Sequence, residues 1–129
     1  MFISGSLSGM TKPDTNLKTV LLRPRVYIGD NIAIGPGKID LLRLVGETRS
    51  ISAAGRALGI PYKRAWLLLD TLNQGFGRPL FETATGGKGG GGAKLTPLGQ
   101  ELLARYAELE ERINAASVPE LEALKALAG

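Results

Sequence analysis

The sequence predicts a mainly α fold with a short β hairpin, and three observations point to it. Apolar residues recur at helical spacing in five stretches between Ile39 and Leu127. Short strand-like runs precede the first stretch and flank residues 86–92. Residues 86–92 are six glycines and Lys88, and they cannot form a regular element because glycine loses too much backbone entropy there.

Composition narrows the function classes. The chain has 129 residues, enough for one ordinary domain or one small domain with arms. It has no cysteine and no histidine, which excludes disulfides, Cys/His zinc sites and His-based catalysis. The carboxylates show no pairing for acid–base chemistry, so we expect no enzyme activity, metal or cofactor. Without an apolar run of about 20 residues or a signal peptide, we expect a cytoplasmic protein without a membrane partner.

Charge is distributed unevenly along the chain. The net charge is +4 and the isoelectric point is near 9.6. Residues 36–99 hold nine basic and four acidic residues, a net charge of +5, whereas residues 100–129 hold three basic and six acidic residues. The middle of the chain is therefore the candidate anion-binding body, although charge alone also fits two solvated faces.

The N-terminal part is predicted to contain little helix. Residues 1–16 are rich in Ser, Gly, Thr and Lys, which is typical of a disordered arm. Residues 17–34 fit two short strands, or a strand and a turn, around Gly29-Asp30-Asn31. A helix follows the break at Gly35-Pro36-Gly37, with an apolar face that includes Ile39, Leu42 and Val45.

A short helix, a glycine turn and a longer helix come next. Ser50 is a suitable N-cap for the short helix, whose stripe of Ile51, Ala54 and Leu58 we expect to be buried. Gly59 suits the left-handed position after the last turn. The longer helix is predicted over 61–74, with Trp66 assigned to the core; its inner stripe consists of Ala65, Leu69, Leu72 and Phe76.

Residues 80–83 and 93–95 are predicted to be strands on either side of the glycine run. Thr96-Pro97 provides the N-cap and first residue of a further helix. The apolar face of that helix consists of Leu98, Leu102, Tyr106, Leu109 and Ile113. Ser117 and Glu120 have capping-box spacing ahead of a last short helix with Leu121, Leu124 and Leu127. We place the main domain at 17–99 and C-terminal dimerisation helices at 100–129.

Helix, short helix, glycine turn and helix in this order are typical of a helix-turn-helix, and the strand, glycine loop and strand that follow make it a winged variant. A helix fits the major groove of B-DNA with its N-terminal residues at the base edges. Here that turn carries Tyr62, Lys63 and Arg64. The glycine hairpin, with Lys88 and Lys94, can bring its backbone close to phosphates. The sequence therefore predicts double-stranded DNA as the partner.

Three runs carry a family resemblance: YKRAW at 62–66, GGKGGGGAKLT at 86–96 and SISAA at 50–54. The first two resemble the N-terminal DNA-binding domain of the ModE family of molybdate-dependent transcriptional regulators, and the third is shared with LysR-type regulators. The likeness covers about Gly37 to Ala116. It implies a winged-helix homodimer that binds a palindromic operator, with the flanking helices at the dimer interface.

The sequence departs from the family pattern in three places. The 129 residues do not extend into the family's molybdate-binding domains, so we expect them to bind no molybdate. Pro61 stands where the family usually has a serine N-cap, which leaves the first N–H groups for water or phosphate. Leu67 stands where the family commonly has an acidic residue, and it is either exposed or in contact with a thymine methyl group or a partner. The operator sequence is therefore not transferred.

The predicted DNA contacts come from the helix-turn-helix and the wing. Lys63 and Arg64 are assigned to DNA, and the wing lysines to phosphate or the minor groove. Tyr62 either stacks on the sugar-phosphate backbone or packs on the turn. Ser52 either contacts phosphate or only starts its helix, and Arg49 either contacts phosphate or serves solubility. The full set is Arg49, Ser52, Tyr62, Lys63, Arg64, Lys88 and Lys94.

Two other interpretations of the sequence compete with DNA binding. A nucleotide P-loop is disfavoured because Lys94 follows Ala93 and precedes Leu95, where the motif needs Gly and Ser or Thr. The alternative that remains is a winged-helix protein–protein interaction module. In that case Leu67 and the acidic C-terminal helices would serve protein docking.

Overall fold

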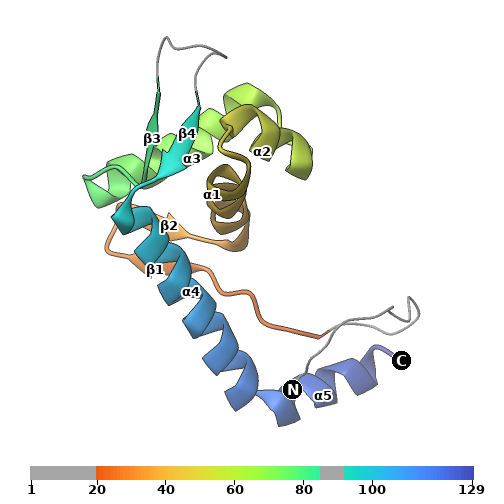
Figure 1. Cartoon of the computed structure of the whole chain (residues 1–129). Helices are drawn as coiled ribbons and strands as arrows, with labels where there is room; N and C mark the ends of the chain where they lie inside the picture. The colour runs from red at the N-terminus through yellow and green to blue at the C-terminus, as the bar shows by residue number, and fades with distance from the viewer. Residues whose placement is uncertain (1–19, 85–91) are drawn as a thin grey trace. The chain divides into compact units, whose positions relative to one another are not determined.

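The computed structural model describes residues 20–84 and 92–129 and divides the chain into two compact units (Figure 1). One unit spans Arg23–Arg112, and the other combines the chain before Arg23 with Ile113–Gly129. Within the described residues, no helix is both long and apolar enough to cross a membrane. The predicted arm at 1–16 and Lys88 lie outside the described residues.

The larger unit begins with a β hairpin and three helices. β1 (Val26–Ile28) and β2 (Ile32–Ile34) pair antiparallel around a turn in which Gly29 has a φ of 61°, so residues 17–34 contain two strands rather than a strand and a turn. The helices are α1 (Pro36–Thr48), α2 (Ile51–Leu58) and α3 (Tyr62–Phe76). α2 packs on α1 and on α3, which is the arrangement of a helix-turn-helix on a supporting helix.

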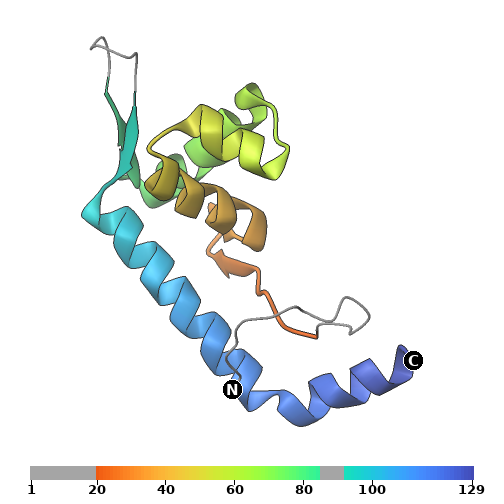
Figure 2. The same cartoon turned by 45° about the vertical axis from the view of Figure 1, so that its right-hand side comes forward.

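A second hairpin follows α3. β3 (Phe81–Thr83) and β4 (Ala93–Leu95) are antiparallel, with Phe81 opposite Leu95. β4 contacts α1, and Figure 2 shows this hairpin beside α1. α4 (Pro97–Ala116) and α5 (Val118–Leu127) complete the chain. The fold is the predicted mainly α winged helix-turn-helix.

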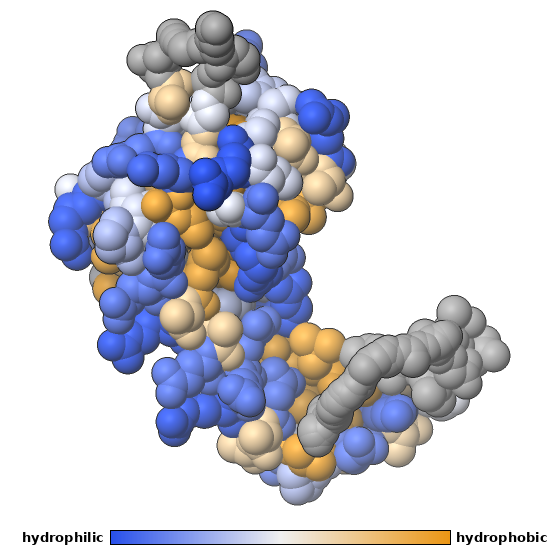
Figure 3. Space-filling view, in the orientation of Figure 1, coloured by the Kyte–Doolittle hydropathy of each residue, from blue (hydrophilic) through white to orange (hydrophobic). Residues whose placement is uncertain are grey.

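The core of the larger unit lies between the three helices and the second hairpin. Its fully buried large side chains are Ile39, Leu41, Leu42, Val45, Leu69, Leu72 and Leu80. Each such side chain contributes about 1.5–3 kcal/mol through burial, so the apolar stripes of α1 and α3 fix their packing. In Figure 3, hydrophilic side chains cover much of the face shown.

The first turn of α4 fixes the base of the wing. The Thr96 hydroxyl accepts a hydrogen bond from the Gly99 N–H at 3.1 Å, as predicted for an N-cap, and donates to the Pro79 carbonyl at 2.8 Å. A Cβ atom at Gly99 would collide with the Leu80 carbonyl oxygen. Only a glycine at position 99 therefore allows the first turn of α4 to lie this close to the backbone at Leu80, the residue before β3.

Two predictions about side chains are wrong. Leu58 is 37% exposed because it lies on the last turn of α2, where the chain turns away at Gly59. The predicted apolar face of α4 is covered by the core as far as Tyr106, and Leu109 beyond it is 37% exposed. Ser117 makes no side-chain cap, since its backbone is not in the extended conformation of an N-cap.

Candidate nucleic-acid interface

The turn between α2 and α3 sets the direction of α3. The Ser50 hydroxyl accepts a hydrogen bond from the Ala53 N–H at 3.0 Å, as predicted. Gly59 has a φ of 70°, and the next residue, Ile60, donates its N–H to the Gly55 carbonyl at 2.8 Å. The turn at Gly59 and the hydrogen bond from Ile60 to Gly55 end α2. α3 begins three residues after Gly59, at Tyr62.

The first turn of α3 has no side-chain cap. Pro61 is extended, and its carbonyl accepts a hydrogen bond from the Ala65 N–H at 2.9 Å. Its ring offers no acceptor for the N–H groups of the first turn. These N–H groups point along the positive end of the helix dipole, which favours an anion.

Tyr62, Lys63 and Arg64, which we name the helix group, are all exposed. Ala65 and Leu69 of α3 are fully buried. Lys63 and Arg64 lie off that buried stripe, whereas Tyr62 lies near the stripe and is exposed at the first residue of the helix. Within residues 20–84 and 92–129, neither Lys63 nor Arg64 forms an ion pair or a side-chain hydrogen bond. Both cations therefore remain available to an anionic partner.

Trp66 connects the helix group to the wing. Its indole N–H donates to the Tyr62 hydroxyl at 2.6 Å. Its ring meets the Phe81 ring of β3 edge-on, with 5.9 Å between the centroids. Trp66 is partly buried against the core, in line with its predicted role.

Arg49 and Lys94, which we name the wing group, lie near each other beside the second hairpin. Arg49 follows α1 with a φ of 61°, the one positive φ among the described non-glycine residues. Its carbonyl accepts a hydrogen bond from the Ala93 N–H of β4 at 2.9 Å. Lys94 is exposed on β4, opposite Glu82 of β3. The Arg49 carbonyl therefore ties the helix-turn-helix to the wing.

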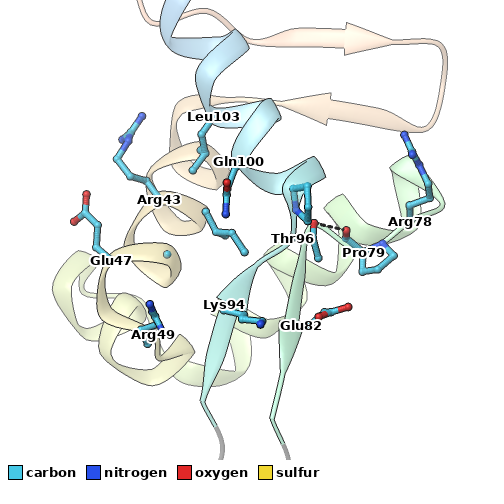
Figure 4. Close-up of a pocket in the computed structure, with 13 residues that line it drawn as sticks. Arg43, Glu47, Arg49, Arg78, Pro79, Glu82, Lys94, Thr96, Gln100 and Leu103 are labelled. Carbon is cyan, nitrogen blue, oxygen red and sulfur yellow. Dashed lines mark hydrogen bonds between the residues drawn. The ribbon is translucent and has the colours of Figure 1, made fainter.

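The wing group lines a surface depression of about 840 Å³ (Figure 4). Further charged residues also line it: Arg43, Glu47, Arg78 and Glu82. Neither Arg43 nor Arg78 was predicted as a site residue from the sequence, although both contribute to the net charge of +5 in residues 36–99. The helix group does not line this depression.

Ser52 lies on the first turn of α2 and is partly buried. Its hydroxyl accepts a hydrogen bond from the Arg56 guanidinium at 2.8 Å. This contact holds Arg56 along the exposed side of α2. Of the predicted site residues, the structure thus places three on α3, two at the wing and Ser52 on α2.

An ion-pair cluster connects α1 to α4. Arg23 donates two hydrogen bonds to Asp40, at 2.7 and 3.1 Å, and one to Glu110 at 3.1 Å, while Arg43 donates to Asp40 at 2.9 Å. Hydrogen bonds from Arg23, and secondarily from Arg43, lower the pKa of Asp40 below its ordinary value. Burial raises the pKa of the Tyr106 hydroxyl, which donates to the Pro24 carbonyl at 2.6 Å. These contacts are structural, because each joins α1 or α4 to the chain ahead of β1 or to a neighbouring side chain.

The described residues hold no group of three or more carboxylates that could bind a metal ion. Residues 37–100 match the family described as "Bacterial regulatory helix-turn-helix protein, lysR family". This segment is therefore similar to bacterial regulatory helix-turn-helix proteins of that family, in line with the helix-turn-helix predicted from the sequence.

The chain is also similar to proteins of the ModE group, in line with the resemblance of the YKRAW and GGKGGGGAKLT runs. The chain is 44% identical over 77 residues to "Molybdenum-pterin-binding protein MopB" of Rhodobacter capsulatus, a match that covers 60% of this chain and 28% of that protein. It is 46% identical over 71 residues to "DNA-binding transcriptional dual regulator ModE" of Escherichia coli K12, covering 55% and 27% respectively. It is 47% identical over 72 residues to "Molybdenum transport protein ModE" of Herbaspirillum seropedicae, covering 56% and 27%. These matches span less than a third of the relatives' lengths.

Proposed function

We propose that the chain is a sequence-specific transcriptional regulator that inserts the first turn of α3 into the major groove of an operator. The observation that carries this proposal is the joint exposure of Tyr62, Lys63 and Arg64 on one helical turn. Lysine and arginine at that position form bidentate contacts to guanine N7 and O6. The wing group and Lys88 then contact phosphates beside the groove. A regulator of this kind acts where the chromosome lies, in the cytoplasm.

Selection from a random-sequence duplex library tests this proposal. The purified chain is expected to enrich a defined sequence, and its affinity for that duplex is expected to fall as salt rises. The selected duplex is also expected to survive an excess of unrelated duplex. If no sequence is enriched and no duplex binds at low salt, the proposal fails.

The operator is proposed to be palindromic and to bind two copies of the chain. Two half-sites about 34 Å apart give a dimer more sequence specificity than one half-site gives a single domain. The exposed apolar residues of α4 and α5, such as Leu109 and Leu124, favour an interface between two copies of the chain. Sedimentation of the chain with the selected duplex tests this. Two chains per duplex and a two-fold symmetric sequence are expected, whereas one chain on an asymmetric site would contradict the dimer.

The molybdenum-related names of the relatives are not extended to these 129 residues. The matches to the three relatives cover 71–77 residues and less than a third of each relative, and we propose that this chain binds DNA without binding molybdate. Calorimetry with molybdate and with tungstate is expected to show no stoichiometric heat. Stoichiometric binding of either oxyanion would overturn this part of the proposal.

A second candidate function rests on Leu67, which is 63% exposed on α3. A large apolar side chain on the reading helix is compatible with docking a protein partner. Pull-down with and without nuclease separates the two functions. Partners lost after nuclease treatment support DNA binding, and partners that persist and depend on Leu67 support the docking module.

A further inference from the structure

The hydrogen bond between Trp66 and Tyr62 leaves one hydrogen atom without a local partner. An indole N–H can only donate, so the Tyr62 oxygen accepts the 2.6 Å bond. The phenolic hydrogen therefore remains for a different acceptor. Among residues 20–84 and 92–129, no group accepts a hydrogen bond from it.

The Tyr62 side chain is held in place from the wing. Tyr62 and Trp66 are four residues apart, on one face of α3. The Trp66 ring rests edge-on against Phe81, with an angle of 61° between the rings. Phe81 is only 4% exposed and is fixed opposite Leu95 in the hairpin. A chain of contacts thus runs from the buried base of the wing to the exposed first residue of α3.

We propose that Tyr62 donates its phenolic hydrogen to a phosphate oxygen of the bound duplex, and that Trp66 is the positioning residue that sets its direction. This inference rests on the proposed DNA-binding function. Tyr62 is 55% exposed at the start of α3, next to Lys63 and Arg64, where positive charge favours an anion over a neutral base edge. A hydroxyl that already accepts a hydrogen bond is polarised and becomes a better donor.

The variant Tyr62→Phe tests the donor, because it removes the hydroxyl and keeps the ring. Affinity is expected to fall about tenfold, the loss of one hydrogen bond to a charged group. The loss should be equal for a duplex selected from the random library and for an unrelated duplex, since phosphates carry no sequence information. The salt dependence should not change, because no charge is removed. The matched control is Tyr27→Phe, at a residue of β1 that is 70% exposed, and its affinity should equal that of the natural chain.

The variant Trp66→Phe tests the positioning role, because it keeps a ring against Phe81 and removes the indole N–H. On its own it is expected to weaken binding about threefold. In a chain that already carries Tyr62→Phe it should cause no further loss, since its effect acts through the hydroxyl. A double variant whose loss equals the product of both single losses would overturn the positioning role.

The single tryptophan of the chain gives a readout that does not depend on binding. Its indole N–H signal in the NMR spectrum is expected to move upfield in Tyr62→Phe, and an unmoved signal would overturn the proposed pair even if Trp66→Phe does not fold. Unchanged affinity in Tyr62→Phe, or a loss confined to the selected duplex, would overturn the phosphate contact. If the natural chain binds no duplex, the proposed function fails; if it binds and Tyr62→Phe binds equally, only this inference fails.

Discussion

The helix group and the wing group both present cations, but the two regions hold them differently. Lys63 and Arg64 have no partner among the described residues and stand on a helix whose other side is buried. Arg49 and Lys94 share their depression with Glu47 and Glu82. Because a neighbouring carboxylate offsets part of a cation's attraction for phosphate, we expect strong, directed contacts from α3 and weaker ones from the wing side.

The two regions also depend on different backbone features. α3 is oriented by the capped start of α2 at Ser50 and by the turn at Gly59. The wing is held by the Arg49 carbonyl and by the close approach of Gly99 to Leu80. The attachment of the wing can therefore be altered by substitutions that leave the α2–α3 turn untouched.

The largest expected effect is on the attachment of the wing. In Gly99→Ala the new methyl group would collide with the Leu80 carbonyl, so the backbone must move to make room. We expect this movement to lower the free energy of unfolding by about 2–4 kcal/mol. The matched control is Gly37→Ala in α1, where a Cβ atom meets nothing within 4 Å and stability should stay equal or rise slightly. Urea unfolding measures both, and equal midpoints would contradict the close approach.

The next effect distinguishes base reading from general attraction. Lys63→Ala and Arg64→Ala are each expected to cost about 1–3 kcal/mol on the selected duplex and much less on an unrelated one. The control variant Arg105→Ala also removes one positive charge, from a side chain on α4 that is 73% exposed. It should change the affinity for the selected duplex and for the unrelated duplex only slightly. Competition binding measures the ratio; equal losses on both duplexes would reject direct base reading by the helix group.

A smaller effect separates backbone strain from charge in the wing group. Arg49→Gly keeps the carbonyl that binds Ala93 and removes the cost of a non-glycine residue at φ 61°, so stability should rise by about 1 kcal/mol. DNA affinity should nevertheless fall on all sequences, and the salt slope should drop by about one. Thermal unfolding and salt titrations measure the two changes. If Arg49→Gly binds DNA as tightly as the natural chain does, Arg49 does not contact DNA.

The smallest effect concerns the ion-pair cluster. The pKa of Asp40 is lowered in the folded chain from 3.8, so its contribution is present above that pH and is lost as the pH falls through the folded value. With partly exposed partners, Asp40→Asn should cost about 1 kcal/mol near neutral pH. Unfolding measured down to acid pH should show the two curves converging, and a constant difference would contradict the ion pair. DNA binding at neutral pH should be unaffected.

The elements of the fold could be predicted because their signals are local. Ser50 as an N-cap, Gly59 at a positive φ and Thr96 ahead of Pro97 each act within one helical turn. The same holds for the exposure of Lys63 and Arg64, which follows from the apolar stripe on the opposite side of α3. Local capping and periodicity are therefore enough to predict the helices and strands and the exposure of Lys63 and Arg64.

The remaining features depend on contacts between residues far apart in the sequence. The left-handed backbone of Arg49 and its bond to Ala93 need the wing in place, and the edge contact of Trp66 needs Phe81. Leu58 and Leu109 fit their apolar stripes, yet burial requires a covering element that the structure does not provide within their unit. Periodicity indicates which face is apolar but not how far along a helix the core extends.

The most direct test of base reading by the helix group replaces each purine of the selected duplex, one at a time, with its 7-deaza analogue, which removes only the N7 acceptor of the major groove. At one or more positions, the natural chain is expected to lose affinity by about 1–3 kcal/mol, and that loss should vanish in Lys63→Ala or Arg64→Ala. If no position is sensitive in the natural chain, or if sensitivity persists in both variants, the first turn of α3 does not read the major groove.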